Sequence, residues 1–429
     1  MNTASRLGLA CLVLSLLVGC PKKPGTINDF VPPPDYERPL PPGMMGLSKV
    51  ADKDIPDFTA ACADLKGMRE GVQNSLAYMS KPSSKAAYAR YGPTFTHERT
   101  TESLKAFAAL LDSNPSPAKL SATIREKFDV YTSVGWNGRG EVLFTGYYTP
   151  IFDASPTPTE RFKYPIYRQP GDIQKNADGT IIGTYPTRKE LETTQIARLA
   201  GLEMYWLADA FEVYIVHVQG SARLRMADGQ LVGVGYAANN GHDYVSIGKL
   251  MLADGKIEKG GLSLRAMMDY FTAHPSDVAT YTRQNPRFVF FAENPGDPRG
   301  SLNEPVIAWR SVATDKAIFP RASVVFVSAG MPRRANNFIG IVPYSGFALD
   351  QDTGGAIRAP GRCDMYMGIG EDAGELAGRT QEKGRLYYLL LKPELMPGTQ
   401  PPTGMPLTAL PLAPGPLPSE PPMPGGPVE

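Results

Sequence analysis

Histidine is scarce in this sequence, and neither sign of charge dominates. The 429 residues contain four histidines (His97, His217, His242 and His274) and 44 basic residues against 43 acidic ones. The histidines lack metal-ligand spacing such as H-x-x-x-H, so a zinc enzyme or a Ser-His-Asp hydrolase has little support. No basic field favours nucleic acid as a partner, and no acidic tract suggests a metal buffer. The apolar share of 42% is typical of a globular protein.

A hydrophobic run long enough to cross a bilayer is absent from the N-terminus. Leu7–Val18 is an apolar run of roughly a dozen residues behind a short positive segment, which is typical of a signal peptide. The following Leu-Val-Gly-Cys20 resembles a bacterial lipobox, which predicts a lipoprotein signal peptide at 1–19 and acylation of Cys20. By resemblance to bacterial lipoprotein sorting rules, Pro21 in place of Asp implies the outer membrane, with the protein facing the periplasm. The alternative is an ordinary cleaved signal in which Cys20 has no role.

Cysteine is also rare, with four residues in the whole chain. Cys11 would be lost with the signal peptide, which leaves Cys62 and Cys363 beyond the anchor. In an oxidising periplasm these two residues could form a disulfide, or they could remain separate thiols. The sequence leaves both alternatives open because it does not give their separation.

Proline marks the two ends of the mature chain. Residues 20–46 contain runs such as VPPPDYERPLPPG and are predicted to form an extended tether. Residues 396–429 alternate Pro with Gly, Leu and Met and are predicted to be a disordered tail. The folded body is therefore expected at 47–395.

The folded body begins with helical patterns and continues with β patterns. Apolar spacing predicts helices at Phe58–Met79, from Thr101, at Pro117–Phe128, at Arg188–Leu199 and at Leu264–Ala273. From Gly140 the pattern is largely β. We predict a strand at Val213–Gln219 and a hairpin turn at Asp228-Gly229. Short apolar runs bounded by Pro, Gly and Asp predict a small closed barrel in the last part of the chain.

Three aspartates in this last part lie at the ends of predicted strands, beside turn signals. They are Asp315, Asp352 and Asp364. Loops at the ends of a barrel often present functional groups, so these carboxylates could converge in a cleft. The alternative is that they cap turns through local hydrogen bonds. Gly354 and Gly355 allow backbone conformations closed to other residues and let a ligand approach the main chain.

Several stretches together resemble one bacterial enzyme family. They are FTGYYTPIF at 144–152, HVQGSARLRMADG at 217–229, VGYAANNGHDYVSIGK at 234–249, NPRFVFF at 285–291, AWRSVATDKAIFP at 308–320, DTGGAI at 352–357 and RCD at 362–364. The last three contain the aspartates and resemble the "3D" domain, which is named for three aspartates. The whole set, in this order, is similar to the membrane-bound lytic murein transglycosylase A family and covers nearly the whole folded body.

The resemblance implies a fold and an activity. The fold is mainly β with helices: a double-psi β-barrel domain at 47–151 plus 289–395, with a smaller β domain inserted at 152–288. The activity is lytic cleavage of the β-1,4 bond between N-acetylmuramic acid and N-acetylglucosamine in peptidoglycan, which leaves a 1,6-anhydro ring. No cofactor and no metal are implied.

The resemblance also implies roles for the acids. Asp364 matches the general acid that then acts as base, and Asp352 matches a second aspartate that we expect to orient the site and to keep Asp364 protonated. Asp315 is expected to support the site structurally. Asp350 is a further candidate, whose alternative is a solvated loop acid.

Other matched residues are expected to bind sugar. They are Tyr148, Thr149, Gln219, Gly220, Ser221, Gly354 and Gly355, with Tyr147 beside them. Side chains such as Gln and Ser can bond sugar hydroxyls and N-acetyl groups. Core packing is the alternative for the tyrosines. Tyr366 could pack under Asp364.

Two other functions remain open from the sequence. One is a non-catalytic peptidoglycan- or polysaccharide-binding wall module, which would not need Asp364. The other is a hydrolase with Cys363 as nucleophile, which would require a nearby histidine base. The expected partners are peptidoglycan glycan strands, the outer membrane through the lipid anchor, and other cell-wall enzymes.

Overall fold

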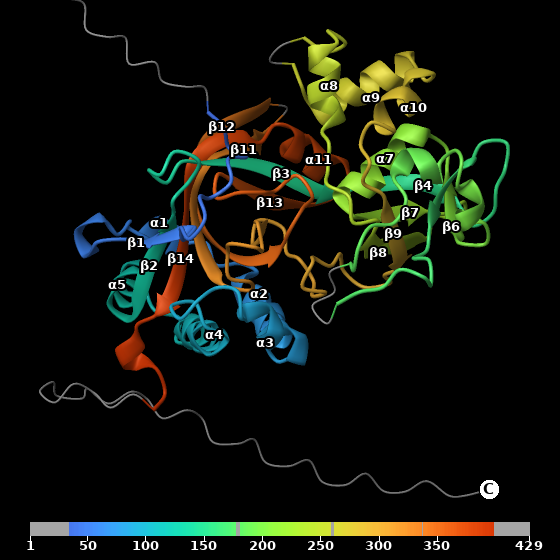
Figure 1. Cartoon of the computed structure of the whole chain (residues 1–429). Coiled ribbons are helices and arrows are strands. Elements are labelled where there is room, and N and C mark those ends of the chain that lie inside the picture. Colours follow the sequence, from blue (N-terminus) through green and yellow to red (C-terminus); the bar gives the residue numbers. More distant parts are fainter. Residues whose placement is uncertain (1–33, 177–180, 259–260, 337, 399–429) are drawn as a thin grey trace, which may run out of the picture. The chain divides into compact units, whose positions relative to one another are not determined.

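The computed structural model describes residues 34–176, 181–258, 261–336 and 338–398 (Figure 1). The predicted signal peptide with Cys20, most of the Pro-rich tether and nearly all of the predicted tail lie outside these residues. No helix within the described residues is both long and apolar enough to cross a membrane.

Six strands form a closed barrel. In ring order they are β3 (Val142–Thr149), β14 (Gln381–Leu391), β11 (Val324–Ala335), β12 (Phe338–Asp352), β10 (Ser311–Ala313) and β13 (Arg362–Ile369), and β13 pairs with β3. Two of the pairings, β10–β12 and β13–β3, are parallel. β2 (Phe128–Ser133) and β1 (Leu47–Lys49) extend the sheet beyond β14. The prediction of a mainly β fold with a closed barrel is confirmed.

A second sheet of six strands comes from the segment between β3 and β10. Its order is β5 (Tyr164–Tyr167), β6 (Glu203–Leu207), β4 (Ile151–Ser155), β7 (Ser221–Arg225), β8 (Leu231–Asn239) and β9 (Val289–Glu293). Because β4 and β9 belong to this sheet, we propose that the inserted domain runs from about Ile151 to Glu293. The predicted turn at Asp228-Gly229 joins β7 to β8, and Gly229 there has a φ of 85°.

Helices precede the barrel and accompany the inserted sheet. The first group is α1 (Thr59–Cys62), α2 (Met68–Met79), α3 (Pro82–Tyr88), α4 (His97–Asp112) and α5 (Pro117–Lys127). The second is α6 (Arg188–Leu191), α7 (Ala210–Gln219), α8 (Ile247–Ala253), α9 (Leu264–Ala273) and α10 (Asp277–Thr282). α11 (Glu371–Gly378) lies between β13 and β14, and short 3-10 turns occupy Asp52–Asp54, Ile196–Leu199 and Pro393–Leu395.

Two predicted helices are interrupted. The segment Phe58–Met79 forms α1 and α2 because Gly67 adopts a left-handed φ of 78° immediately before Met68. The segment Arg188–Leu199 forms α6 and a separate 3-10 turn. By contrast, α5 and α9 match their predicted ranges closely. α4 begins earlier than predicted, because the Thr96 hydroxyl accepts a hydrogen bond from the Arg99 N–H and caps it there.

The predicted strand at Val213–Gln219 is wrong, because this segment is the body of α7. Its β-branched residues favour a strand by propensity alone. The Asp209 carboxylate, however, accepts hydrogen bonds from the N–H groups of Phe211 and Glu212 and starts a helix. The helix then buries Phe211, Tyr214, Ile215, Val216 and His217. Burial in the inserted domain overrides the local preference.

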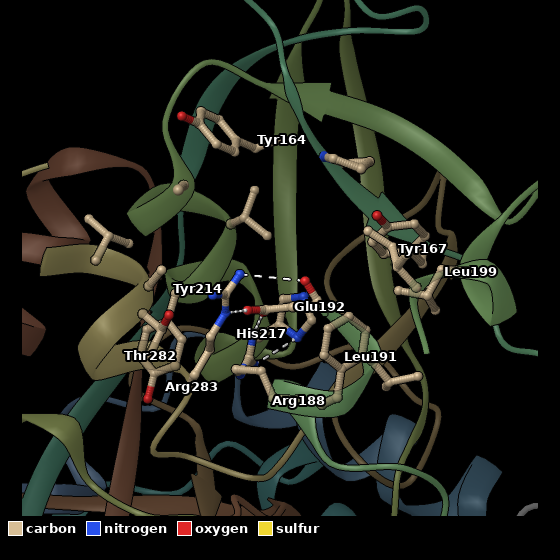
Figure 2. A pocket seen from close by; sticks show the side chains of 17 residues that line it. Tyr164, Tyr167, Arg188, Leu191, Glu192, Leu199, Tyr214, His217, Thr282 and Arg283 are labelled. Carbon is tan, nitrogen blue, oxygen red and sulfur yellow. Dashed lines mark hydrogen bonds and ion pairs between the residues drawn. The ribbon is translucent and has the colours of Figure 1, made fainter. Parts of the chain in front are cut away.

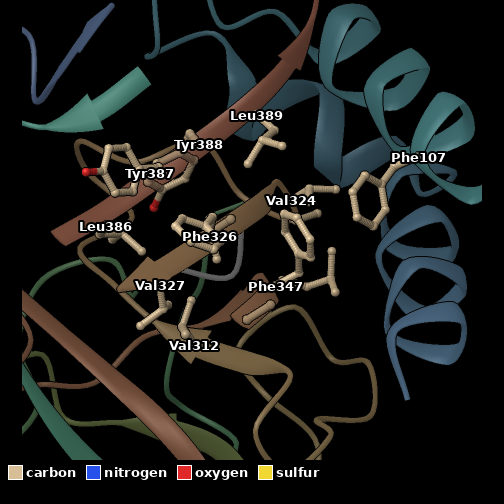
Figure 3. Close-up of a cluster of buried hydrophobic side chains, with 14 of the residues drawn as sticks. Phe107, Val312, Val324, Phe326, Val327, Phe347, Leu386, Tyr387, Tyr388 and Leu389 are labelled. Atoms are coloured by element: carbon tan, nitrogen blue, oxygen red, sulfur yellow. The ribbon is translucent and has the colours of Figure 1, made fainter. Parts of the chain in front are cut away.

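Aromatic and branched side chains fill the barrel core. Figure 3 shows Phe326 of β11 and Phe347 of β12 together with Phe107 of α4. The ring centroids of Phe326 and Phe347 are 5.6 Å apart, and those of Phe107 and Phe347 are 5.3 Å apart. α4 therefore packs against the barrel core, and it is also tied to the end of β14, where the Ser103 hydroxyl accepts a hydrogen bond from the Leu391 N–H and Arg99 Nε donates one to the Leu391 carbonyl.

We predict that Phe326→Ala destabilises the protein by about 3–5 kcal/mol, because it removes a side chain that is 1% exposed and leaves a cavity. The matched control is Phe338→Ala, whose side chain is 72% exposed and whose loss should change stability by less than about 0.5 kcal/mol. Urea unfolding of the two variants measures the difference. Equal effects would contradict the assigned core.

Candidate active site

The register of β13 on β3 determines which side chains share a face. The parallel pairing sets Asp364 opposite Thr145 and Tyr366 opposite Tyr147. Side chains alternate along a strand, so Arg362, Asp364 and Tyr366 lie on one face of β13. Cys363, on the other face, is fully buried in the barrel core.

Asp364 is a mostly buried carboxyl with one hydroxyl and one guanidinium beside it. Its side chain is 17% exposed, and the Thr145 hydroxyl donates a hydrogen bond to Oδ1. Arg362 Nη2 lies 3.9 Å from the same oxygen and donates a hydrogen bond of 3.2 Å to the Thr145 hydroxyl. Burial raises the pKa of Asp364 to about 6, Arg362 acts in the opposite direction, and the charge of Asp352 adds to the increase. A large fraction of this carboxyl is therefore protonated near pH 6.

Asp352 ends β12 and accepts three hydrogen bonds. Its Oδ1 accepts from the backbone N–H groups of Ser301 at 2.7 Å and Thr353 at 2.8 Å. Its Oδ2 accepts from the Tyr147 hydroxyl at 2.9 Å. Burial raises the pKa of Asp352, while these donors act against the increase. Thr145 and Tyr147, two residues apart on β3, therefore connect both acids to the same strand.

Asp315 supports the loop between the two acids. It is 7% exposed, and its carboxylate accepts hydrogen bonds of 2.9 Å from the N–H groups of Ala317 and Ala359. Ala359 has a φ of 68°, which is unusual for a residue with a side chain. The Asp315 bond thus holds a strained part of the segment that leads from Asp352 to Asp364.

Asp350 is not the solvated loop acid that the sequence suggested as an alternative. It is fully buried and paired with Lys316, and it accepts hydrogen bonds from the hydroxyls of Thr314 and of Tyr388 at 2.7 Å. A buried charge needs this number of partners to offset its lost hydration. Asp350 therefore supports the barrel interior and lacks the exposure that a substrate contact requires.

Gly354 and Gly355 do not use the left-handed backbone that glycine allows, because neither has a positive φ. A Cβ on Gly355 would lie 3.1 Å from Arg287 Nε and 3.1 Å from the Tyr244 Cβ. The lack of a side chain thus lets the Arg287 and Tyr244 of the inserted domain approach the loop that follows Asp352. A glycine at position 355 is therefore explained by the close approach of these two side chains and not by the geometry of a turn.

The residues predicted to bind sugar hydrogen-bond one another where β3 meets the inserted domain. The Tyr148 N–H donates to Gln219 Oε1 at 3.2 Å, and the Thr149 hydroxyl lies 3.3 Å from that of Ser221. Tyr148 is 8% exposed and Thr149 1%. Gly220 ends α7 with a φ of 76°, beside the partly exposed Gln219. Within this group Gln219 and Gly220 are partly exposed, whereas Tyr148, Thr149 and Ser221 are buried.

Tyr366 was expected to pack under Asp364, and its ring packs against that of Tyr147. The ring centroids of the two tyrosines are 5.1 Å apart, and the Tyr366 hydroxyl lies 3.0 Å from that of Thr149. The ring fixes the position of Tyr147, whose hydroxyl holds Asp352. Tyr366 therefore acts on the second acid more directly than on the first.

Both cysteines that the structure describes are buried free thiols, Cys62 and Cys363. Burial raises the pKa of the Cys363 thiol well above its usual range, so the reactive thiolate is disfavoured. Because the Cys363 side chain is also 0% exposed, the structure does not support this thiol as the nucleophile of a hydrolase. Among the described residues, no group of three or more His, Cys, Asp or Glu could hold a metal ion.

Two contributors were missed from the sequence, Thr145 and Arg362. Thr145 lies two residues before Tyr147 in FTGYYTP, and Arg362 lies two residues before Asp364. The two-residue alternation of a strand would have placed each on the right face. The partnership of Thr145 with Asp364 needed the register of the β13–β3 pair.

Comparison with known proteins identifies the family. Residues 143–292 match the MltA specific insert domain, and residues 310–390 match the 3D domain. The chain is 32% identical to membrane-bound lytic murein transglycosylase A of Escherichia coli K12 over 271 residues, which cover 62% of this chain and 70% of that protein. The chain belongs to the membrane-bound lytic murein transglycosylase A family. The Vibrio cholerae protein of that name is also 32% identical, over 273 residues, 62% of this chain and 71% of its own length.

Solved members of the family have the same fold. The Agrobacterium tumefaciens membrane-bound lytic murein transglycosylase is 25% identical, with a TM-score of 0.67 over 81% of this chain and 98% of that one. The E. coli protein with bound chitohexaose is 26% identical, with a TM-score of 0.63 over 84% of this chain and 97% of that one. These likenesses confirm the family fold expected from the motifs.

We predict that Asp364→Asn stabilises the protein more at pH 7.5 than at pH 3.5. The folded pKa of about 6 lies above the usual 3.8, so the charged form is disfavoured by folding. This cost is absent below pH 3.8, grows as the pH rises toward 6 and is complete above it, where it amounts to about 3 kcal/mol. Urea unfolding of both proteins at the two pH values measures it, and a pH-independent difference would contradict the raised pKa.

Proposed function

We propose that this protein is a peptidoglycan lytic transglycosylase that uses Asp364 as its general acid and then as its base. The bond cleaved is the β-1,4 link between N-acetylmuramic acid and N-acetylglucosamine, and the product carries a 1,6-anhydro ring. The observation that carries the proposal is a mostly buried carboxyl with a pKa near 6 at the end of a barrel strand. Membership in a lytic murein transglycosylase family supports the substrate, as does the chitohexaose bound to the E. coli relative.

One carboxyl is sufficient for this reaction because the nucleophile belongs to the substrate. Most glycosidases need one carboxyl as acid and another as base or nucleophile. Here the C6 hydroxyl of the muramic acid attacks its own C1, while protonated Asp364 gives its proton to the leaving glycosidic oxygen. The resulting carboxylate then accepts the proton of the C6 hydroxyl. Asp364 thus ends the cycle protonated, and no water enters the product.

The neighbours of Asp364 suit both halves of this cycle. Burial and the nearby Asp352 charge favour the protonated form that must begin the reaction. The Thr145 hydroxyl and the Arg362 guanidinium favour the carboxylate that follows proton transfer. A pKa near 6 is a compromise that lets one group donate and then accept a proton.

Asp352 is proposed to orient the site and to contribute to the pKa of Asp364. Three hydrogen-bond donors fix the position of the Asp352 carboxyl, and each favours its charged form. Burial is the larger cause of the raised pKa, so the contribution of Asp352 is secondary. It is nevertheless the contribution that a single substitution can remove.

Family members are named as membrane-bound, and the lipobox supports anchoring of this chain in a membrane. We propose the outer membrane, through acylated Cys20, with the catalytic body in the periplasm. There it would meet glycan strands and other cell-wall enzymes.

The reaction can be tested on purified peptidoglycan sacculi with protein that begins at Pro21. Mass spectrometry should detect released fragments one water lighter than hydrolysis products, and Asp364→Asn should slow their release by at least about 10²-fold. Asp269→Asn, an exposed acid on α9, is the matched control and should retain activity. Hydrated fragments would identify a hydrolase, and binding to sacculi without release would identify a non-catalytic wall module.

The pH profile tests the role of Asp352. Activity should fall as the pH rises above about 6, because Asp364 loses its proton. Asp352→Asn removes the negative charge that raises the pKa of Asp364, so this falling limb should move toward lower pH. The limb should stay in place in Asp269→Asn. An unmoved limb in an active Asp352→Asn protein would show that Asp352 has no electrostatic role.

A further inference from the structure

The end of the predicted tether packs against the barrel beside the candidate site. The Tyr36 hydroxyl donates a hydrogen bond of 2.8 Å to Glu141 Oε1, and the Tyr36 and Trp136 rings meet edge-on with centroids 5.8 Å apart. The Arg38 guanidinium lies 5.8 Å from the centroid of the Trp136 ring. A Cβ on Gly361 would lie 2.6 Å from the Tyr36 carbonyl oxygen, so a glycine there lets the segment reach β13. These contacts hold the segment between Tyr36 and Arg38 at the start of β13.

Glu37, in this segment, joins two cations from different parts of the fold. Its two carboxylate oxygens lie 2.8 and 2.9 Å from Nζ of Lys249, on α8 of the inserted domain. Its Oε1 also lies 3.5 Å from Nη1 of Arg362, at the start of β13. Exposed ion pairs contribute little to stability, but the Arg362 side chain is only 13% exposed and is therefore screened less by water. Glu37 can thus influence where the Arg362 guanidinium lies.

The Arg362 guanidinium lies between two carboxylates. Its Nη1 faces Glu37, and its Nη2 is 3.9 Å from Asp364 Oδ1, which is too far for a hydrogen bond. Nη2 instead donates to the Thr145 hydroxyl at 3.2 Å. A direct arginine–carboxylate hydrogen bond would be about 2.8 Å long and would lower the pKa of the acid strongly. Such a bond would keep Asp364 charged, whereas the proposed reaction begins from its protonated form.

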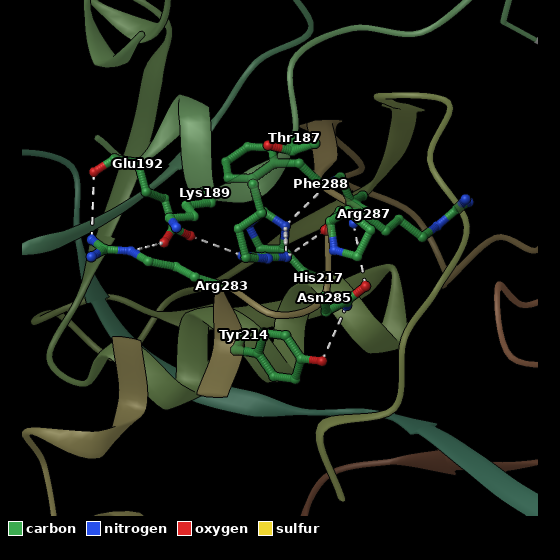
Figure 4. A network of polar contacts seen from close by, with 12 residues as sticks. Thr187, Lys189, Glu192, Tyr214, His217, Arg283, Asn285, Arg287 and Phe288 are labelled. Atoms are coloured by element: carbon green, nitrogen blue, oxygen red, sulfur yellow. Dashed lines mark hydrogen bonds and ion pairs between the residues drawn. The ribbon is translucent and has the colours of Figure 1, made fainter. Parts of the chain in front are cut away.

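Lys249 is attached to the core of the inserted domain. The Ser246 hydroxyl accepts a hydrogen bond of 3.3 Å from the Lys249 N–H and caps α8. Immediately before it, the Val245 N–H donates to the Asn285 side chain at 3.1 Å. Asn285 donates in turn to the Tyr214 hydroxyl at 3.1 Å, a bond that Figure 4 shows. Tyr214 also forms part of the wall of a cavity of about 250 Å³ inside this domain (Figure 2).

Other ionisable side chains face Asp364 and Arg362 from the neighbouring elements. They are Asp352 of β12, Tyr147 of β3, Cys363 of β13 and Tyr244 of the segment before α8. Burial raises the pKa of Tyr147, Cys363 and Tyr244, so these three are uncharged near pH 6. Within the described residues, Arg362 forms ion pairs with Glu37 and Asp364 alone. Glu37 is therefore the carboxylate that competes with Asp364 for this guanidinium.

We propose that Glu37 is a positioning residue of the active site, which holds Arg362 away from Asp364 and leaves that acid free to carry a proton. This role rests on the proposed function, in which Asp364 is the general acid. Lys249 holds the other side of the Glu37 carboxylate, so the inserted domain contributes to the same arrangement. The end of the tether is then a working part of the site as well as a connection to the predicted lipid anchor.

Glu37→Gln keeps the size of the side chain and removes its charge. Arg362 should then move toward Asp364, so the titration of that acid should shift from about 6 to lower pH by roughly 0.5 or more. Carbon-13 NMR can follow it in protein that begins at Pro21 and contains aspartate labelled at the side-chain carboxyl. The Asp364 signal is identified by its loss in Asp364→Asn. Because this measurement needs no catalysis, it remains valid if the lytic reaction is not found.

Two further variants test whether the effect passes through Arg362. Lys249→Gln leaves Glu37 to pair with Arg362 alone, so the Asp364 titration should stay in place or move to higher pH. In an Arg362→Gln background the guanidinium is absent, so adding Glu37→Gln should shift the titration by less than about half of its effect in the natural protein. Thermal unfolding shows whether each variant is folded.

An unchanged Asp364 titration in Glu37→Gln would overturn the proposal. So would an equal downward shift in Lys249→Gln, which would indicate a general disturbance of the segment. An undiminished effect of Glu37→Gln without Arg362 would assign the shift to direct charge repulsion, and would also contradict a positioning role. If Arg362→Gln does not fold, the comparison of Glu37→Gln with Lys249→Gln still decides the question.

Activity on peptidoglycan sacculi gives a second measurement. The falling limb of the pH profile should move to lower pH in Glu37→Gln by about the same amount as the NMR titration. A shifted titration with an unmoved limb would contradict Asp364 as the acid of the reaction, and would leave the contact between Glu37 and Arg362 as a property of the fold alone. The two measurements therefore separate failure of the positioning role from failure of the proposed function.

Discussion

The candidate site depends on the parallel pairing of β3 with β13. This pairing sets Thr145 opposite Asp364 and, two residues further, Tyr147 opposite Tyr366. The same face of β3 therefore presents one hydroxyl to each of the two acids. A shift of one residue would turn Asp364 into the barrel core and bring Cys363 to the site, because the side chains of a strand alternate. The fully buried Cys363 and Met365 on the other face resist such a shift.

The remaining polar groups of the barrel hold this geometry in place. Asp315 bonds the Ala359 N–H in the segment between the acids, and Asp350 forms a buried pair with Lys316 beneath them. Such a pair adds little net stability compared with apolar packing, but loss of one partner leaves an uncompensated charge. The three aspartates of the motif therefore have different positions. Asp352 and Asp364 lie close enough for the charge of one to affect the pKa of the other, and Asp315 holds the segment between them.

The sequence predicted the acids better than their surroundings. Asp352 and Asp364 were found because they lie in recognisable motifs beside glycine turns, and the closed barrel followed from short apolar runs with turn residues between them. Thr145 and Arg362 were missed because their roles depend on a pairing between segments 219 residues apart. The helix α7 was mistaken for a strand, because its β-branched residues are buried by neighbours that local patterns do not reveal. Long-range contact, rather than local preference, decided each of these cases.

The separation of Thr145 and Asp364 along the chain also has a kinetic consequence. The whole inserted domain lies between them in sequence, with its own sheet and its own core. Contacts between such distant segments form slowly, because a long loop must close before they stabilise the chain. The inserted domain can condense from nearer neighbours, whereas the barrel closes only when β13 and β14 reach β3. The contact between Thr145 and Asp364 should therefore form in one of the last steps of folding, after most of the protein is already native.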